Sequence, residues 1–186
     1  MTYKPMDITA VGILMIEHRQ IERVIEVIKT ELEITDKEGR AKPEFIDIAI
    51  DFIRTYADKS HHGKEEQIFF RDLYKKKLTK EHKEYIDMLI DEHKKGRETV
   101  AKLEGAKKKY LEGNSDALGE IKECMKWLID FYPQHIEKED KHFFALYRNY
   151  LNEKEQNNML SECLEFDASG IHEKYKDIIE RLKKVK

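Results

Sequence analysis

Four stretches of the chain repeat apolar residues at intervals of three and four, and this pattern constrains the fold more than any other feature. They lie from Asp7 to a polar connector at 36–42, from Pro43 to a break at 78–79, from Thr79 to a turn at 113–116, and from that turn to about residue 151. An α-helix has 3.6 residues per turn, so each stretch places its apolar residues on one helical face. Four long helices joined by short polar loops predict an all-α fold, an antiparallel up-down four-helix bundle.

The helix ends and the C-terminal segment complete this prediction. Asp7 and Thr79 are predicted N-caps, and Pro43 suits a first helical position. The apolar pattern weakens from residue 152, and residues 167–170 interrupt it. We expect two shorter helices there, packed outside the bundle. The chain is then a single domain over residues 1–186, with the bundle at about 8–151 and a C-terminal helical extension at 152–186.

Composition excludes several classes of function. The chain has 186 residues and a net charge of −3, so no large field of one sign indicates nucleic acid or an anionic membrane as a partner. Cys124 and Cys163 form no spaced motif. The first residues lack the pattern of a signal peptide, and no apolar run is long enough to cross a bilayer. A cytoplasmic protein is expected, either a monomer or a homodimer.

Each apolar stripe contains a histidine: His18, His61, His93 and His135. In an antiparallel bundle such positions can meet at one level of the core. His61 and His135 are each followed four residues later by a glutamate, Glu65 or Glu139. Residues at i and i+4 share a helical face, so each pair can reach one metal centre.

An internal repeat supports this choice of residues. The segment 61–70 (HHGKEEQIFF) aligns without a gap with 135–144 (HIEKEDKHFF), and the histidine, lysine, glutamate and two phenylalanines fall at equal offsets. His62 and Glu66 also form an i,i+4 pair. The repeat nevertheless selects His61 with Glu65.

A purely structural network is the alternative to a metal site. A lone core histidine is usually hydrogen-bonded to a neighbour, and protonated histidines or Arg97 could neutralise buried glutamates. So many buried ionisable groups are seldom left unpaired in a helical bundle, which favours metal. Imidazole and carboxylate without thiolate suit iron, manganese or zinc, and six ligands exceed the needs of one tetrahedral zinc ion. The set describes a dinuclear centre.

At these residues the chain resembles the hemerythrin-like (HHE cation-binding) family. The similarity covers about residues 8–150 and rests on four motifs in order, at 17–22 (EHRQIE), 61–66 (HHGKEE), 92–97 (EHKKGR) and 135–140 (HIEKED). It implies a non-haem centre of two iron ions with an oxo or hydroxo bridge. Zinc and manganese are less favoured. It also implies a small diatomic or peroxide ligand, because family members bind dioxygen, sense iron or oxygen, or act on peroxide or nitric oxide.

The resemblance implies a set of metal ligands, with Glu65 and Glu139 bridging the two irons. The ligands would be His18, His61, Glu65, His93, His135 and Glu139. Oxygen-carrying hemerythrins have a further histidine where this chain has Arg97, which cannot ligate a cation. About two of roughly twelve octahedral positions then stay open, which favours chemistry on oxygen species over simple carriage. His62 or Glu22 could fill one of them, and both alternatives stay open.

The leading hypothesis is a non-haem di-iron protein that binds or turns over dioxygen, hydrogen peroxide or nitric oxide. Its electron donor is not identified by the sequence. The alternatives are an iron- or oxygen-responsive sensor, with a surface or the tail from Asn152 to Lys186 as its signalling part, and a metal-storage module without turnover, possible also with zinc.

Overall fold

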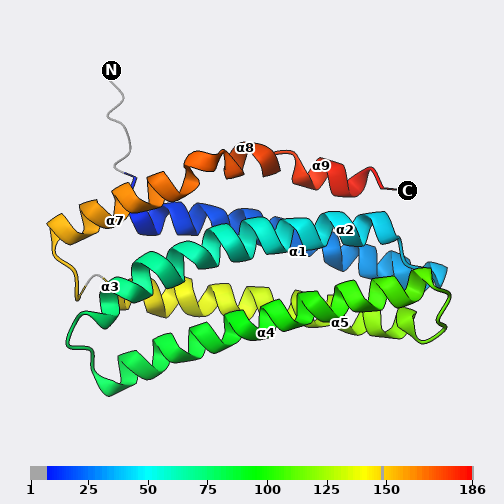
Figure 1. Cartoon of the computed structure of the whole chain (residues 1–186), viewed down its shortest axis with the longest axis horizontal. Helices are drawn as coiled ribbons and strands as arrows, with labels where there is room; N and C mark the ends of the chain where they lie inside the picture. Colours follow the sequence, from blue (N-terminus) through cyan, green and yellow to red (C-terminus); the bar gives the residue numbers. More distant parts are fainter. Residues whose placement is uncertain (1–7, 148, 186) are drawn as a thin grey trace.

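Helices make up every regular element of the computed structural model, which describes residues 8–147 and 149–185 (Figure 1). Within these residues there is no strand, which confirms the predicted all-α class. Four long rods lie side by side, and the C-terminal segment runs along α1 and α2 (Figure 1).

The first rod is α1 (Ala10–Glu38). Its N-cap is Thr9, whose hydroxyl oxygen accepts a hydrogen bond from the Gly12 backbone N–H at 3.0 Å. Asp7, the predicted N-cap, lies outside the described residues. The helix ends at Gly39, whose φ of 66° is the left-handed conformation that glycine adopts without steric cost.

The second rod combines two kinds of helix. Along the chain it consists of α2 (Pro43–Phe52), η1 (Ile53–His62), η2 (Glu65–Phe70) and α3 (Arg71–Tyr74). Pro43 is the first residue of α2, as predicted. A regular α-helix was expected throughout, but η1 and η2 are π-helices, with wider turns closed by i→i+5 hydrogen bonds. The wider winding turns the adjacent residues His61 and His62 both inward, and both are buried.

The third rod is α4 (Lys80–Leu111), and the fourth is formed by α5 (Ala117–Lys138), η3 (Glu139–Phe143) and α6 (Phe144–Tyr147). The prediction that Thr79 caps α4 is confirmed, since its hydroxyl accepts from the His82 backbone N–H at 3.2 Å. A π-helix again begins at Glu139, the equivalent of Glu65 in the internal repeat.

The C-terminal segment contains more helices than predicted. It forms α7 (Glu153–Phe166), the 3₁₀ turn η4 (Asp167–Ser169), α8 (Ile171–Tyr175) and α9 (Ile178–Lys183). Two helices were expected after residue 151, but the second of them is divided at residues 176–177. Tyr175, Ile178 and Leu182 are buried against the rods.

Two apolar clusters fill the interior, and a polar layer separates them. On α1, Leu14 belongs to one cluster and Ile21 to the other, with His18 between them. On α4, Leu89 and Val100 are divided in the same way. Every rod crosses this layer, so side chains from distant parts of the chain meet there.

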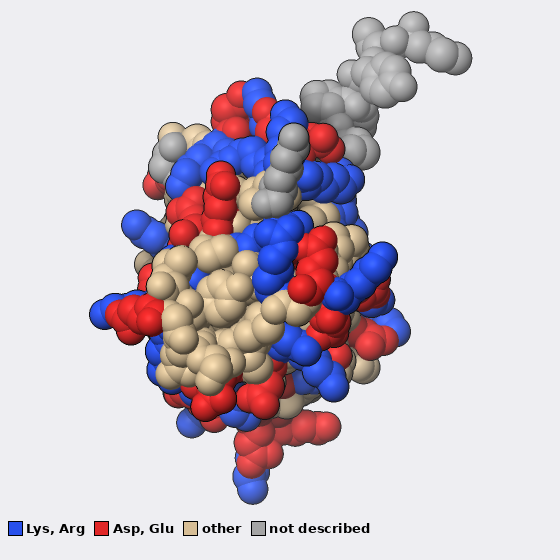
Figure 2. Space-filling view, turned by 90° about the vertical axis from the view of Figure 1, so that its right-hand side faces the viewer, with Lys and Arg blue, Asp and Glu red and all other residues tan. Residues whose placement is uncertain are grey.

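The surface is charged but carries no large field of one sign on the face shown. Lys and Arg alternate with Asp and Glu around an uncharged area at the end of the molecule seen in Figure 2. None of the helices in the described residues combines the length and hydropathy needed to cross a membrane.

Candidate metal centre

Side chains predicted to bind metal occupy the polar layer. Each of them is between 0% and 1% exposed: His18, His61, Glu65, His93, His135 and Glu139. α1 and α4 supply one histidine each, η1 and α5 supply the other two, and the carboxylates stand at the starts of η2 and η3. The structure therefore brings all six together.

The Glu139 carboxylate faces histidines on both sides of the layer. Its Oε2 atom lies 3.2 Å from His18 Nε2. Its Oε1 atom lies 3.2 Å from His135 Nε2 and 3.7 Å from His93 Nε2. One carboxylate thus reaches ring nitrogens from three rods.

The Glu65 carboxylate has the same two-sided arrangement. Its Oε1 atom lies 3.6 Å from His61 Nε2, and its Oε2 atom lies 3.5 Å from His93 Nε2. Both glutamates therefore stand between a pair formed by the histidines at 18 and 61 and a pair formed by those at 93 and 135.

Most of the inward-facing polar atoms in this layer are buried and have no hydrogen-bond partner among the described residues. They are His18 Nε2, His93 Nε2, His135 Nε2 and both carboxylate oxygens of Glu65 and Glu139. Buried polar groups are nearly always satisfied, because an unmade hydrogen bond costs about 1–3 kcal/mol per group. These are also the donor atoms that iron, manganese and zinc accept, so the residues present fit a metal centre.

The pKa shifts of the two glutamates also indicate that this layer needs positive charge. Burial and the nearby charge of Glu139 raise the pKa of Glu65 well above its ordinary value. Burial also acts against ionisation of Glu139, but the facing histidines, His135 and His18 among them, outweigh it and hold its pKa low. Ionisation of both carboxylates therefore requires positive charge beside them, from protonated histidines or from bound cations.

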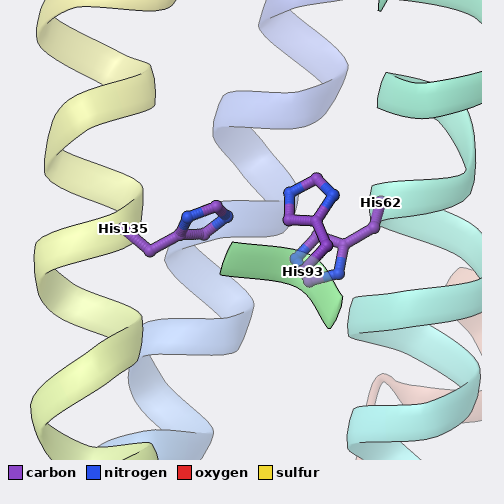
Figure 3. Close-up of side chains that lie close together, drawn as sticks. All are labelled: His62, His93 and His135. Atoms are coloured by element: carbon purple, nitrogen blue, oxygen red, sulfur yellow. The ribbon is translucent and has the colours of Figure 1, made fainter. Parts of the chain in front are cut away.

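His62 is the additional ligand candidate that the structure places at the centre. Its ring stacks on that of His93, with centroids 3.8 Å apart, and points toward His135 from the second rod (Figure 3). These three histidines offer nitrogen atoms within 4.8 Å of one another. A second such group consists of His18, His61, Glu65 and Glu139. The layer therefore contains two adjacent positions suited to an ion.

Glu22, the other additional candidate, points elsewhere. Its carboxylate lies 3.3 Å from Arg19 Nε, and its side chain is about one-third exposed. It belongs to none of the groups of potential ligands found among the described residues.

The outer nitrogen of each core histidine donates to a carboxylate from the neighbouring rod. The four Nδ1-to-carboxylate distances are all 2.8 Å: His61 to Glu17, His93 to Glu66, His135 to Glu92, and His18 to Asp140. When the ring is neutral, these bonds place its one proton on Nδ1, and Nε2 is then left facing the layer with a free lone pair.

A sequence pattern marks these carboxylates, although the spacing of residues along each helix did not identify them. Each one is the immediate neighbour of a predicted ligand, in the doublets 17–18, 65–66, 92–93 and 139–140. However, each carboxylate is hydrogen-bonded to a histidine of a different rod, so its role depends on how the rods are arranged.

Every one of these outer carboxylates is bonded to a cation as well. The pairs are Glu17 with Lys64, Glu66 with Arg97, Glu92 with Lys138, and Asp140 with Arg19. Lys64 and Lys138 occupy equal offsets in the internal repeat. Each lysine follows a core histidine, His61 or His135, by three residues, and each pairs with the carboxylate that is hydrogen-bonded to that same histidine. The repeat therefore includes the outer contacts of the centre.

Arg97, which stands where oxygen carriers have a histidine, holds two carboxylates. Its Nε lies 2.7 Å from Asp58 Oδ1, and its Nη2 lies 2.7 Å from Glu66 Oε1. Asp58 is the partner of His62 Nδ1 at 3.4 Å, and Glu66 is the partner of His93. Arg97 thus bonds to both of the carboxylates that are the partners of His62 and His93.

The C-terminal segment also reaches the centre. The Lys64 ammonium is fully buried and donates to Glu17 at 2.5 Å and to Asp167 of η4. His172 of α8 lies 3.2 Å from Asp167 Oδ2 and 3.4 Å from Glu17 Oε1. Burial raises the pKa of Glu17 to about 7, although Lys64 acts in the opposite direction.

Gly63 allows this contact. A Cβ atom at that position would stand 3.0 Å from Cζ of Phe166, the last residue of α7. Gly63 therefore lets the tail pack closely against the rod that carries the ligands.

Comparison with protein-family models finds one matching family, described as the hemerythrin HHE cation binding domain, over residues 9–147 and again over 84–186. No curated protein and no solved structure matches the chain significantly. The second stretch begins in α4, in keeping with the internal repeat.

Proposed function

We propose that this chain, which belongs to the hemerythrin HHE cation-binding domain family, binds two iron ions in its polar layer and uses them to bind or turn over a small oxygen species. The observation that carries the proposal is the position of Glu65 and Glu139. Each has one oxygen toward each histidine pair, as a bridging carboxylate requires.

In this proposal the two ions have different ligands. His18 and His61 hold one ion, and His93 and His135 hold the other, with His62 as a third histidine on that second ion. Glu65 and Glu139 bridge the ions, and an oxo or hydroxo group completes the bridge. Glu22 is not included, because its carboxylate pairs with Arg19.

The choice of iron rests on the donor set and the family. Zinc and manganese accept the same donor atoms and are the alternatives that metal analysis must exclude. A pair of bridged iron ions supplies two one-electron redox steps and open positions for dioxygen, hydrogen peroxide or nitric oxide. The chain's own part is to present neutral Nε2 atoms, bury the bridging carboxylates and keep bulk water out of the layer.

The position of His62 weakens one argument against dioxygen carriage. That argument rested on the missing histidine at position 97. His62 lies where a fifth imidazole can reach the ion, so about one coordination position, rather than two, stays open. Carriage and turnover are then both compatible with the ligand count.

We also propose the finer architecture on which this centre depends. The rods alternate in direction, as in an antiparallel up-down four-helix bundle, and the chain is one domain that includes its C-terminal extension. The support is that Asp167 and His172, from that extension, contact groups that hold the centre.

Metal quantification combined with optical spectroscopy tests the function. Protein made in iron-replete medium should contain about two irons per chain, as two octahedral sites imply, and absorb in the near ultraviolet. Addition of hydrogen peroxide should change the spectrum or release dioxygen. His135→Ala should lose iron, whereas His142→Ala, an exposed histidine of the same rod, should keep it. Iron-loaded protein that responds to neither peroxide, dioxygen nor nitric oxide would contradict the proposal.

A sensor is the second candidate, and one contact favours it. The Lys64 ammonium joins Glu17, which orients His61, to Asp167 in the tail. A change at the ion held by His61 could therefore alter how the tail is held. A large metal-dependent change in proteolysis of residues 152–186 would support sensing, and equal proteolysis with and without metal would contradict it.

A further inference from the structure

A cavity of about 260 Å³ lies beside the metal layer, between α4 and η1. Ile53, Val100 and the ring of Tyr132 provide apolar walls, and the rings of His62 and His93 form its border with the centre. All five side chains are buried. The cavity thus borders two of the three histidines that form one of the ion positions.

Charged side chains stand at its outer rim. Arg97 and Asp58 line the cavity as an ion pair, with side chains 39% and 27% exposed. The interior is therefore mainly apolar, and its entrance is polar.

Gly96 contributes to this space. It follows His93 by three residues, as Ile21 follows His18, so the other half of the bundle has a bulky side chain at the corresponding position. A Cβ on Gly96 would lie 3.7 Å from Phe131 Cε1, an ordinary contact. Close packing does not require this glycine, although glycine in a helix costs about 1 kcal/mol relative to alanine.

Tyr132 supplies a free donor at the cavity. Its side chain is 2% exposed, no hydrogen bond joins its hydroxyl to a described residue, and the hydroxyl oxygen is not sealed in the core, so it is open to the cavity that the ring lines. A tyrosine hydroxyl can donate a hydrogen bond to an oxygen atom of a ligand there.

The size and lining of the cavity indicate the class of ligand. A water molecule occupies about 30 Å³, so dioxygen or hydrogen peroxide would leave most of this cavity empty. We propose that it binds a compact organic hydroperoxide, with its apolar body against Ile53 and Val100 and an oxygen accepting a hydrogen bond from Tyr132.

This inference rests on the proposed function and names the substrate class for it. Reduction of the hydroperoxide would break its O–O bond and take two electrons from a ferrous pair held by the six ligands and His62, which would become ferric, and two protons from solvent. An alcohol and water are released. The alcohol has the same hydrocarbon group as the substrate but lacks the reactive O–O bond, so it can serve as a probe of binding.

Calorimetric titration of the full chain with 2-phenyl-2-propanol, the alcohol of cumene hydroperoxide, tests the pocket. Saturable binding is expected. Gly96→Leu, which fills the cavity, should weaken it at least tenfold. Gly105→Leu is the matched control, because Gly105 lies on the same helix with open space around it. Absence of saturable binding, or equal affinity in both glycine variants, would overturn the proposal.

Tyr132→Phe provides a second test that requires little repacking. Loss of one neutral hydrogen bond, worth about 0.5–1.5 kcal/mol, should weaken binding of the alcohol about two- to twelvefold. Binding of isopropylbenzene, which lacks the hydroxyl group, should not change. Equal losses for both probes would contradict the role of the Tyr132 hydroxyl.

The failure of this inference is distinguishable from that of the proposed function. Two irons and a response to hydrogen peroxide without binding of the alcohol would refute the pocket alone. Alcohol binding in a protein that takes up no pair of irons would refute the di-iron function and leave a binding cavity.

Discussion

Glu92 Oε2 accepts a hydrogen bond from His135 Nδ1 at 2.8 Å, so that a carboxylate of α4 orients a histidine of α5. The same relationship recurs from each rod to the next: α1 supplies Glu17, the second rod Glu66 and the fourth rod Asp140. The bonds close a circuit around the layer. Each histidine is therefore held by a rod other than its own.

Breaking one bond of this circuit should weaken metal binding. Glu92→Gln keeps the shape of the side chain but removes the charge that supports His135. Changes to such outer partners typically cost about 10- to 100-fold in metal affinity, and we expect a loss in this range. Competition with a chelator measures it. Glu104→Gln, on the same helix but paired with Arg54 at the surface, should bind metal normally.

Arg97 should matter less than Glu92, because it acts through two carboxylates rather than on a histidine. Arg97→Gln releases Asp58 and Glu66 from their shared cation. We expect a loss of metal affinity below the roughly tenfold typical of a direct partner, with a shift in the near-ultraviolet absorption of the iron protein.

Arg71→Gln is its control, because Arg71 also holds two carboxylates, Asp72 and Glu162, and does not line the cavity beside the centre. An unchanged spectrum in Arg97→Gln would show that Arg97 is an ordinary surface residue.

Lys64 should be important for stability. It is fully buried between Glu17 and Asp167, and Lys64→Met leaves both carboxylates without their cation. Removing one partner of a buried ion pair costs about 3–5 kcal/mol, so the free energy of unfolding should fall by about this amount.

Lys138→Met is the natural comparison, since Lys138 occupies the equivalent place in the repeat but is 34% exposed. Its effect on urea-induced unfolding should be clearly smaller. Equal effects would mean that the contact with the tail adds no stability.

His172 should make the attachment of the tail depend on pH. Its hydrogen bond to Asp167 raises its pKa above the ordinary value of about 6.5. A raised pKa in the folded state means that protonated His172 stabilises the fold. This contribution is complete below about pH 6.5 and is lost as the pH rises through the higher folded-state pKa.

The unfolding midpoints of the unmodified chain and His172→Gln should therefore differ most in mildly acidic solution and converge in alkaline solution. The side chain is 45% exposed, so solvent screening limits the difference to less than about 1 kcal/mol. A difference that grows with pH would contradict this assignment.

Much of this structure was predictable from local pattern. The apolar stripes indicate the helices because burial follows the 3.6-residue period, and Thr79 and Pro43 mark helix starts through capping and backbone chemistry. The six side chains of the layer follow from histidines and glutamates that interrupt apolar stripes.

Other features depend on tertiary structure and were not predictable in this way. The π-helical winding, which turns His61 and His62 both inward, breaks the period on which the prediction relied. Glu17, Glu92 and Asp140 are each hydrogen-bonded to a histidine of a neighbouring rod. Contacts between rods have no signature in the spacing of residues along one helix.

Anomalous diffraction at the iron absorption edge, from crystals of the iron-loaded protein, tests the central claim most directly. The account predicts two adjacent iron peaks, one beside His18 and His61 and the other beside His93, His135 and His62, with Glu65 and Glu139 between them. A single peak, or no peak in this layer of a protein that contains iron, would contradict it.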